Sequence, residues 1–169
     1  NPKKVKDRIK FNYLLRNHIL RNSGLIDSYL FQFRLNKELK LIYGGNLGLP
    51  QNSILISKFI SKIELLDNIS FKIIGSGTKF KFLRNYINVN KIKKTQILNN
   101  LSKADYFNEL ENADIGLIFL NERFTIPNYP SRILDYLYFD LAIISNTDIN
   151  TDITDFIKNA KVGNCFYGV

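Results

Sequence analysis

The chain has little of the chemistry that stabilises small secreted domains or builds zinc sites. Its 169 residues include one cysteine, Cys165, and one histidine, His18. A single thiol excludes an internal disulfide, and one histidine with one cysteine supplies too few ligands for a zinc site. We expect Cys165 to be a small buried apolar residue rather than a nucleophile, because no histidine is placed to act as its base. These absences fit a reducing cytoplasm.

Long hydrophobic runs and a secretion signal are also missing. No stretch of roughly eighteen apolar residues occurs, so the sequence predicts neither a membrane-spanning helix nor a signal peptide. Methionine and tryptophan are absent altogether. Because the chain lacks a starting methionine and ends on the apolar run VGNCFYGV, we expect it to be a piece of a longer protein.

Acidic residues are outnumbered. The chain carries 24 Lys and Arg against 15 Asp and Glu, a formal charge of +9, and much of the excess lies in residues 1–40 and 79–94. A surplus of this size favours anionic partners such as nucleic acid, anionic lipid or phosphorylated ligands. The alternative is that these are ordinary solvated lysines, and the sequence leaves both interpretations open.

What the chain does have is a regular alternation of apolar strands and amphipathic helices. Residues 1–38 read as a basic helical arm or linker, and a separate domain is expected over 39–169. Strands are expected within 39–45, 69–77, 94–100, 114–120 and 141–145, with a further strand at 163–169. Helices are expected within 49–66, 78–87, 103–113, 131–139 and 150–160, the first with Pro50 in its opening turn. This order predicts an α/β fold, a doubly wound parallel sheet of Rossmann type.

Ligands of such sheets bind at the carboxyl ends of the strands, so the strand-to-helix loops are the candidate sites. The first loop carries Gly44, Gly45 and Gly48, and the second runs GSGT from Gly75 to Thr78. Glycines let backbone amides approach a ligand, and the helix that follows directs its positive end to the same place, which suits a diphosphate. The spacing is not the dinucleotide GxGxxG, and glycines also make ordinary tight turns.

The long loop 120–131 is the most informative. Pro127 and Pro130 stiffen it, and Ser131 is expected to cap the next helix. Arg132, at the start of that helix, has the bidentate geometry that phosphate oxygens accept, and Asp135 one turn later could bind a ribose diol. The alternative is a capped helix with an ordinary solvated Arg and Asp.

Two further loops give weaker signals. Backbone groups of residues 99–101 could contact a flat base, whereas Tyr106 and Phe107 are expected in the core rather than as stacking platforms. Asp148 and Asp152 flank the start of the last helix, and we interpret them as capping residues rather than metal ligands.

Four blocks, in this order and spacing, resemble the C-terminal domain of bacterial retaining GT-B glycosyltransferases of group 1 or family 4, the capsule, O-antigen and colanic-acid type. They are LIYGGNLGLPQN, FKIIGSG, YFNELENADIGLIFL and IPNYPSRILDYLYFDLAIIS. The resemblance covers residues 39–169 and implies one half of a GT-B fold. It implies binding of a nucleotide-sugar, usually a UDP-sugar, without a metal or other cofactor. The acceptor-binding N-terminal domain of such enzymes has no counterpart in this sequence.

The resemblance also implies roles for individual residues. The diphosphate would lie against the two glycine loops, the base near Leu101, and the ribose on Asp135. Arg132 would be the catalytic cation. The complete set of donor-binding residues implied is Gly44, Gly45, Asn46, Gly48, Gly75, Ser76, Gly77, Leu101, Pro130, Ser131, Arg132 and Asp135.

Three positions depart from the family pattern. Asn46 and Gln51 stand where relatives often carry Arg and Lys, and Asp135 replaces the commoner Glu. An upstream Glu that contacts the sugar falls near Thr125 or Ile126, neither of which is acidic. The identity of the sugar is therefore open.

The resemblance implies retaining transfer of a sugar to a polysaccharide or lipid-linked acceptor, with the fragment inactive by itself. A glycan acceptor and the missing acceptor domain are then the partners, no nucleic acid is bound, and the basic arm could rest on the inner membrane. Two alternatives remain: a sugar-nucleotide epimerase of the same architecture, and a non-enzymatic basic module that binds nucleic acid or lipid.

Overall fold

The computed structural model describes residues 38–121, 129–147 and 151–167. The expected arm at 1–38, with His18, lies outside these ranges except for its last residue. So do Thr125, Ile126, Pro127 and Asp148, and their predictions stay untested.

Strands and helices alternate along the described chain. The strands are β1 (Leu39–Gly44), β2 (Ile69–Ile74), β3 (Thr95–Leu98), β4 (Ile115–Phe119), β5 (Ala142–Thr147) and β6 (Gly163–Tyr167). The helices are α3 (Ser53–Glu64), α4 (Phe80–Val89), α5 (Lys103–Glu111), α6 (Arg132–Tyr138) and α7 (Ile153–Asn159). None of the helices in the described ranges is long and apolar enough to cross a bilayer.

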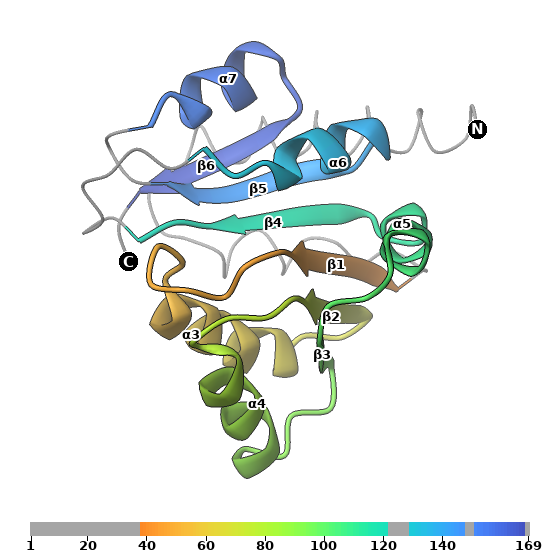
Figure 1. Ribbon diagram of the computed structural model, residues 1–169, viewed down its shortest axis with the longest axis vertical. Helices are drawn as coiled ribbons and strands as arrows, with labels where there is room; N and C mark the ends of the chain where they lie inside the picture. Colours follow the sequence, from red (N-terminus) through yellow and green to blue (C-terminus); the bar gives the residue numbers. More distant parts are fainter. Residues whose placement is uncertain (1–37, 122–128, 148–150, 168–169) are drawn as a thin grey trace.

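All six strands form one parallel sheet in the order β3-β2-β1-β4-β5-β6. This is the strand order of a doubly wound Rossmann fold, and the predicted fold class is confirmed. The sheet runs through the middle of the molecule in Figure 1, with all the strands pointing the same way. The sixth strand, expected at 163–169, pairs with β5.

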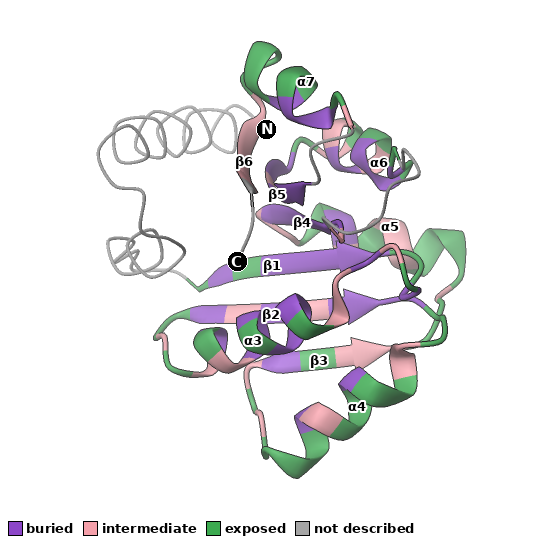
Figure 2. Ribbon diagram, turned by 90° about the vertical axis from the view of Figure 1, so that its left-hand side faces the viewer, coloured by how far each residue is buried: buried purple, intermediate pink, exposed green. Residues whose placement is uncertain are grey.

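Helices cover both faces of the sheet. Alternate residues of a strand point to opposite faces, so Leu41 and Tyr43 of β1 pack with α3 and α4, whereas Ile42 packs with α5, α6 and α7. Figure 2 shows the central strands β1, β4 and β5 mostly buried, the edge strands β3 and β6 less so, and the helices exposed on their outward sides. This two-sided burial explains why the strands read as nearly continuous apolar runs.

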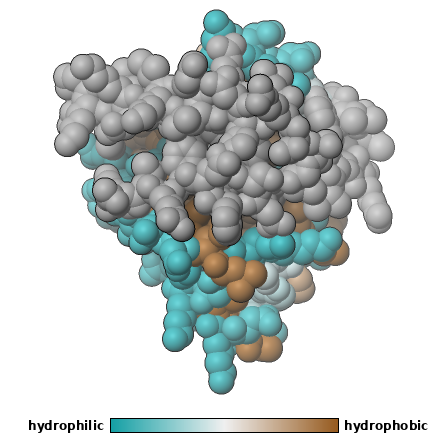
Figure 3. All heavy atoms as spheres, turned by 180° about the vertical axis from the view of Figure 1, so that it is seen from behind, coloured by the Kyte–Doolittle hydropathy of each residue, from teal (hydrophilic) through white to brown (hydrophobic). Residues whose placement is uncertain are grey.

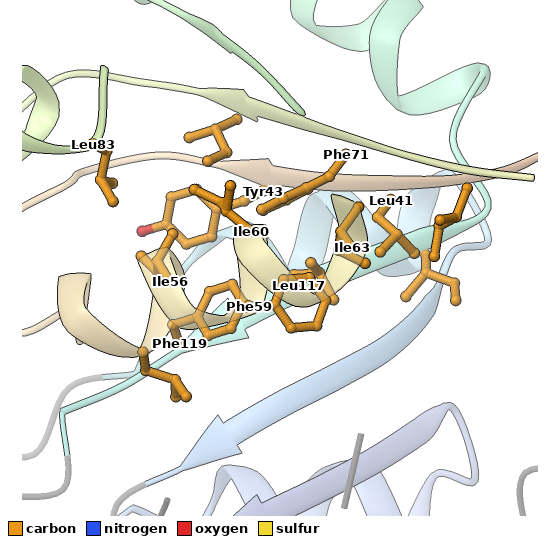
Figure 4. Packing of buried hydrophobic residues seen from close by; sticks show 14 of the residues in the cluster. Leu41, Tyr43, Ile56, Phe59, Ile60, Ile63, Phe71, Leu83, Leu117 and Phe119 are labelled. Carbon is orange, nitrogen blue, oxygen red and sulfur yellow. The ribbon is translucent and has the colours of Figure 1, made fainter. Parts of the chain in front are cut away.

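The larger of the two cores lies under α3. Phe59 meets Phe71 of β2 and Phe119 of β4 edge to face, with ring centroids 5.5 Å apart in both pairs. Figure 4 shows these rings with Ile60 and Ile63 filling the space between helix and sheet. Burial of each such side chain contributes roughly 1.5–3 kcal/mol, so this layer fixes β1, β2 and β4 relative to one another.

The first helix begins later than its sequence suggested. Pro50 does not open α3; Asn52 is the N-cap, and its Oδ1 accepts the Leu55 amide at 3.0 Å. The Pro50 carbonyl instead accepts the Asn121 amide at 2.8 Å, which ties the first loop to the end of β4. The helix starts where a side chain can satisfy its open amides, and Pro50 serves the contact between loops.

The strand order reverses between β1 and β4: β2 and β3 follow on one side, and β5 and β6 on the other. The backbone pairing between β1 and β4 is also short. Pairing between them covers only Leu41 with Ile115 and Ile42 with Gly116. Beyond that point, Gly44 donates its amide to the Tyr136 hydroxyl at 3.1 Å, and that hydroxyl donates to the Leu117 carbonyl at 3.1 Å. The fully buried Tyr136 side chain of α6 therefore connects β1 and β4 where their backbone hydrogen bonds end.

Candidate functional site

The two glycine loops lie directly against each other at the carboxyl ends of β1 and β2. The Gly45 amide donates to the Ile74 carbonyl at 2.9 Å, and the Leu47 amide donates to the Ser76 carbonyl at 2.7 Å. A Cβ atom on Gly75 would stand 1.8 Å from the Gly45 carbonyl oxygen. Glycine is thus required at position 75 by the close approach of a second backbone.

Gly75→Ala should lower the free energy of unfolding by roughly 2–4 kcal/mol, because a backbone oxygen cannot move aside for the new methyl group. Gly48→Ala is the matched control. Its Cβ would meet the Asn46 Nδ2 at 2.9 Å, which is the end of a side chain that can turn away. Urea unfolding of both variants tests this, and equal losses would contradict the assigned role of position 75.

Several amides of these loops donate hydrogen bonds within the protein. Besides Gly45 and Leu47, the Gly48 amide donates to the Gln51 Oε1 at 3.0 Å and the Gly75 amide to the Leu98 carbonyl at 3.0 Å. The expectation that the two loops bind a diphosphate through their amides is not tested by these contacts and stays a prediction. They allow the two loops to pack closely, because they carry no side chain.

Gly44 has a similar packing role. A Cβ there would stand 2.0 Å from the Tyr106 hydroxyl oxygen. The missing side chain makes room for Tyr106, which reaches from α5 to the end of β1. Position 44 therefore gives the Tyr106 side chain room at the end of β1.

Arg132 is the most unusual residue at this edge of the sheet. Its side chain is only 9% exposed, and its Cζ lies 4.4 Å from the centre of the Tyr43 ring. A Cβ on Gly45 would be 3.1 Å from its Nη2, so the guanidinium lies against the first glycine loop. Arg132 therefore reaches from α6 across the end of the sheet to the last part of β1.

The charge of Arg132 lacks an anionic partner among the described residues. Its buried Nη1 has no hydrogen-bond acceptor, and no described carboxylate lies within ion-pair distance. The Tyr43 ring offers a cation–π contact, but a buried guanidinium nitrogen without an acceptor carries a desolvation cost. A bound anion would remove that cost.

The start of α6 differs from the expected capped helix. Ser131 occupies the N-cap position, but its hydroxyl makes no capping hydrogen bond. The Pro130 carbonyl accepts the Ile133 amide at 3.1 Å, so a tight first turn replaces the side-chain cap. Pro130 is buried and Ser131 is exposed beside Arg132.

Asp135 and Tyr106 form a second polar group at the site. Burial raises the pKa of Tyr106 to about 12, and the negative charge of Asp135 adds to the shift. Asp135 itself is half-buried. The carboxylate expected to bind a ribose thus lies near the hydroxyl that fills the space left by Gly44.

The third loop joins the same region. Asn100 donates from its Nδ2 to the Ser76 Oγ at 3.0 Å, which links the second and third loops. Leu101 packs its half-buried side chain against the core under α5 and α6. Asn46 and Gly77 are exposed, and a Cβ on Gly77 would be 2.6 Å from the Asn46 Oδ1. The structure therefore gathers the sequence-predicted residues at one edge of the sheet, and their binding of a donor stays a prediction.

Because of its buried tyrosines, the protein is expected to lose stability as the pH rises in the alkaline range. The folded state holds the Tyr106 proton to about pH 12, whereas an unfolded tyrosine releases it near the ordinary pKa of 10.0. Between these values the unfolded state binds fewer protons, so the free energy of unfolding falls with rising pH, by at most about 1.4 kcal/mol per pH unit. Burial raises the pKa of Tyr43 and Tyr136 as well.

Tyr106→Phe should therefore flatten the decline in stability between the two pKa values. Urea unfolding across that pH range measures the slope, with Tyr138→Phe as a control on an exposed ring. A slope unchanged by Tyr106→Phe would contradict the shift.

Outside this edge the sequence predictions had mixed outcomes. Asp152 occupies the N-cap position of α7, but its side chain makes no capping hydrogen bond. Burial raises the pKa of the half-buried Cys165 thiol to about 11, so the thiol stays protonated at neutral pH. In the described ranges no three His, Cys, Asp or Glu side chains gather as metal ligands.

Sequence reasoning missed the tyrosines that hold this site. Tyr43 supports Arg132 and donates its hydroxyl to the Asn46 carbonyl at 2.6 Å. Tyr136 connects β1 and β4, and Gly116 leaves room for its ring. The available signal was an aromatic residue directly before the glycines that end β1, but the partner of an aromatic residue in another loop cannot be read from spacing.

No family model matches the chain, and no curated protein matches it. Solved structures do. The lipopolysaccharide outer core galactosyltransferase WaaB, in its apo form, shares 16% identity, with a TM-score of 0.60 over 79% of this chain and 37% of WaaB. The GtfA/B complex shares 14% identity, with a TM-score of 0.59 over 81% of this chain and 26% of that one.

The pneumococcal O-GlcNAc transferase GtfA, in complex with UDP and GlcNAc, shares 17% identity, with a TM-score of 0.54 over 75% of this chain and 28% of that one. The chain thus spans between 26% and 37% of the length of these three neighbours. WaaB is a galactosyltransferase and the pneumococcal GtfA an O-GlcNAc transferase. The likeness shows that the chain has the Rossmann-like fold of GT-B glycosyltransferases.

Proposed function

We propose that this chain is the donor domain of a glycosyltransferase and binds a nucleotide-sugar, a UDP-sugar first among the candidates. The proposal is supported by the GT-B-type fold and by a structural neighbour, the pneumococcal GtfA, that was solved in complex with UDP and GlcNAc. The resemblance of the sequence blocks at 39–169 points to the same class.

One observation carries the proposal. Arg132 is a buried cation at the carboxyl edge of the sheet, and among the described residues its Nη1 has no hydrogen-bond partner. A guanidinium binds the paired oxygens of a diphosphate well, and a bound diphosphate would supply the missing acceptor. In Rossmann-type sheets the usual ligand position is this edge, at the point where the strand order reverses.

The other residues have supporting roles in this proposal. The Tyr43 ring lies against the guanidinium, and Gly45 of the first glycine loop leaves room beside it. Asp135 would accept hydrogen bonds from the ribose, and the backbone near Leu101 would contact the base.

The proposed reaction is retaining transfer of the sugar to a polysaccharide or lipid-linked acceptor. Negative charge develops on the departing diphosphate as the anomeric carbon gains positive character, and a fixed cation stabilises that charge. Arg132 is the residue placed to do so, and no metal or further cofactor is part of the proposal. The acceptor would be held by a second domain of the same enzyme, so we expect this chain to bind the donor without transferring it.

Isothermal titration with UDP, GDP, ADP, UMP and inorganic pyrophosphate tests the proposal. We expect UDP to bind more tightly than UMP, because the diphosphate meets Arg132, and more tightly than pyrophosphate, because base and ribose add contacts. Equal affinities for all five anions would contradict the nucleotide-sugar assignment. Salt-sensitive RNA binding without any response to UDP would favour the non-enzymatic module instead.

A further inference from the structure

Tyr43 belongs both to the apolar core and to the candidate site. Its side chain is fully buried, and Figure 4 shows its ring among the apolar side chains under α3. The same ring contacts Arg132, whose Cζ lies 4.4 Å from the ring centre. Charged side chains usually lie on the surface, and the described surface visible in Figure 3 is mainly hydrophilic. Arg132 is instead only 9% exposed, so its position is set by the groups packed around it.

Gly45 confines the same guanidinium. A Cβ atom at position 45 would stand 3.1, 3.2 and 3.3 Å from the Nη2, Cζ and Nε of Arg132. These nearly equal distances place it over the flat face of the guanidinium, because a point at the edge would be clearly farther from the central carbon than from the two nitrogens. The first glycine loop and the Tyr43 ring therefore leave the guanidinium little room to turn.

The Tyr43 hydroxyl fixes the loop beside the cation. It donates to the Asn46 carbonyl at 2.6 Å, and the next amide, that of Leu47, donates to the Ser76 carbonyl at 2.7 Å. A carbonyl and the amide that follows it share one peptide plane and point in opposite directions, so these two hydrogen bonds set the orientation of that peptide. One side chain thus contacts both the guanidinium and the loop next to it.

The two glycine loops supply no positive side chain of their own. Residues 44–51 and 75–78 contain no Lys or Arg. A diphosphate bound against them would need a cation from a neighbouring element, and Arg132 is placed to provide it. Paired N–H groups must point at the phosphate oxygens, and a side chain already held in that orientation loses less rotamer freedom on binding.

We propose that Tyr43 is a positioning residue for donor binding, whose ring holds the Arg132 guanidinium in the orientation that meets a diphosphate. This inference rests on the proposed function. The alternative is that Tyr43 only fills the core, where its ring centre lies 6.0 Å from that of Phe119. A positioning role affects ligands that reach Arg132, whereas a core role affects stability alone.

Isothermal titration with UDP and UMP tests the proposal on Tyr43→Leu, which removes the ring. We expect the affinity for UDP to fall about five- to tenfold, because the guanidinium is no longer held, and the affinity for UMP to change by less than about twofold. Tyr43→Phe keeps the ring and should retain the UDP affinity to within about threefold, since it loses only the hydrogen bond to the loop. Tyr43→Met is a second ringless variant, because methionine adapts to irregular core spaces.

Phe59→Leu is the matched control. It removes another buried ring, on α3, from the same core layer, so it should lower stability in urea unfolding without changing the ratio of UDP to UMP affinity. The double variant Tyr43→Leu/Arg132→Met should bind UDP as Arg132→Met does, because the ring then has no guanidinium to position.

The possible outcomes separate this role from the proposed function. A wild-type chain that binds UDP no more tightly than UMP would overturn both. UDP binding that needs Arg132 but is unaffected by Tyr43→Leu and Tyr43→Met would overturn the role of Tyr43 alone. So would equal losses of UDP and UMP affinity in these variants, or a further loss from Tyr43→Leu in the Arg132→Met background.

Discussion

Arg132→Met should abolish most of the affinity for UDP while leaving the unliganded protein as stable as before. The expected loss of affinity is roughly 10- to 100-fold, the value of a hydrogen bond to a charged group. Methionine keeps most of the side-chain volume over the Tyr43 ring but removes the buried charge. Because the Arg132 Nη1 has no acceptor, its loss removes a desolvation cost along with the cation–π contact.

The free energy of unfolding without ligand should therefore change by less than about 1 kcal/mol or increase. This split distinguishes a binding residue from a structural one. Isothermal titration with UDP and urea unfolding measure the two quantities on the same preparation. Arg84→Met, on an exposed arginine of α4, is the control and should change neither. A large loss of unliganded stability with unchanged UDP affinity would show that Arg132 is structural.

Arg132→Lys refines the test. Lysine keeps the charge but lacks the planar fork that meets two phosphate oxygens together. We expect UDP affinity between those of the wild-type protein and Arg132→Met. Affinity equal to the wild type would mean that only charge matters at this position.

Tyr136→Phe should cost roughly 2–4 kcal/mol of stability, because two buried backbone groups lose their partner at 1–3 kcal/mol each. The hydroxyl accepts the Gly44 amide and donates to the Leu117 carbonyl, both at 3.1 Å, and the side chain is fully buried. No ladder hydrogen bond can replace these, since β1 and β4 no longer pair at that level. Water has little access to satisfy them.

Tyr138→Phe is the matched control, because Tyr138 lies on the same helix and is 79% exposed. Its loss should stay within about 0.5 kcal/mol. Urea unfolding with an unchanged m-value would show that the difference arises in the native state. If Tyr136→Phe were as stable as the control, the hydrogen bonds of the Tyr136 hydroxyl to β1 and β4 would contribute nothing to stability.

The two glycine loops show how far a motif can be interpreted. Gly45 and Gly75 stood out in the sequence as positions where backbone could approach a phosphate. In the structure their amides donate to Ile74 and Leu98, and a Cβ on Gly75 would strike the Gly45 carbonyl. The glycines do lie at the carboxyl ends of β1 and β2, but the backbone that Gly75 approaches is that of the neighbouring loop.

The sequence by itself determined that this protein has a central sheet with helices on both faces. Strands buried on both faces must be apolar throughout, and helices with one buried face must repeat near 3.6 residues, so the alternation from Leu39 onward was sufficient for a doubly wound sheet. It also brought Arg132 and the glycines to the same edge, since parallel strands end together.

Only the tertiary structure decided which groups at that edge remain available. The stacking of Tyr43 under Arg132, the bridge made by Tyr136 and the filling of Gly44's space by Tyr106 join residues between 62 and 92 positions apart. Side-chain and amide partners of this kind depend on packing across several elements, whereas local periodicity reports only which way each element faces. Within the described residues the Arg132 Nη1 has no hydrogen-bond acceptor, and this feature, on which the proposed function depends, follows from that packing.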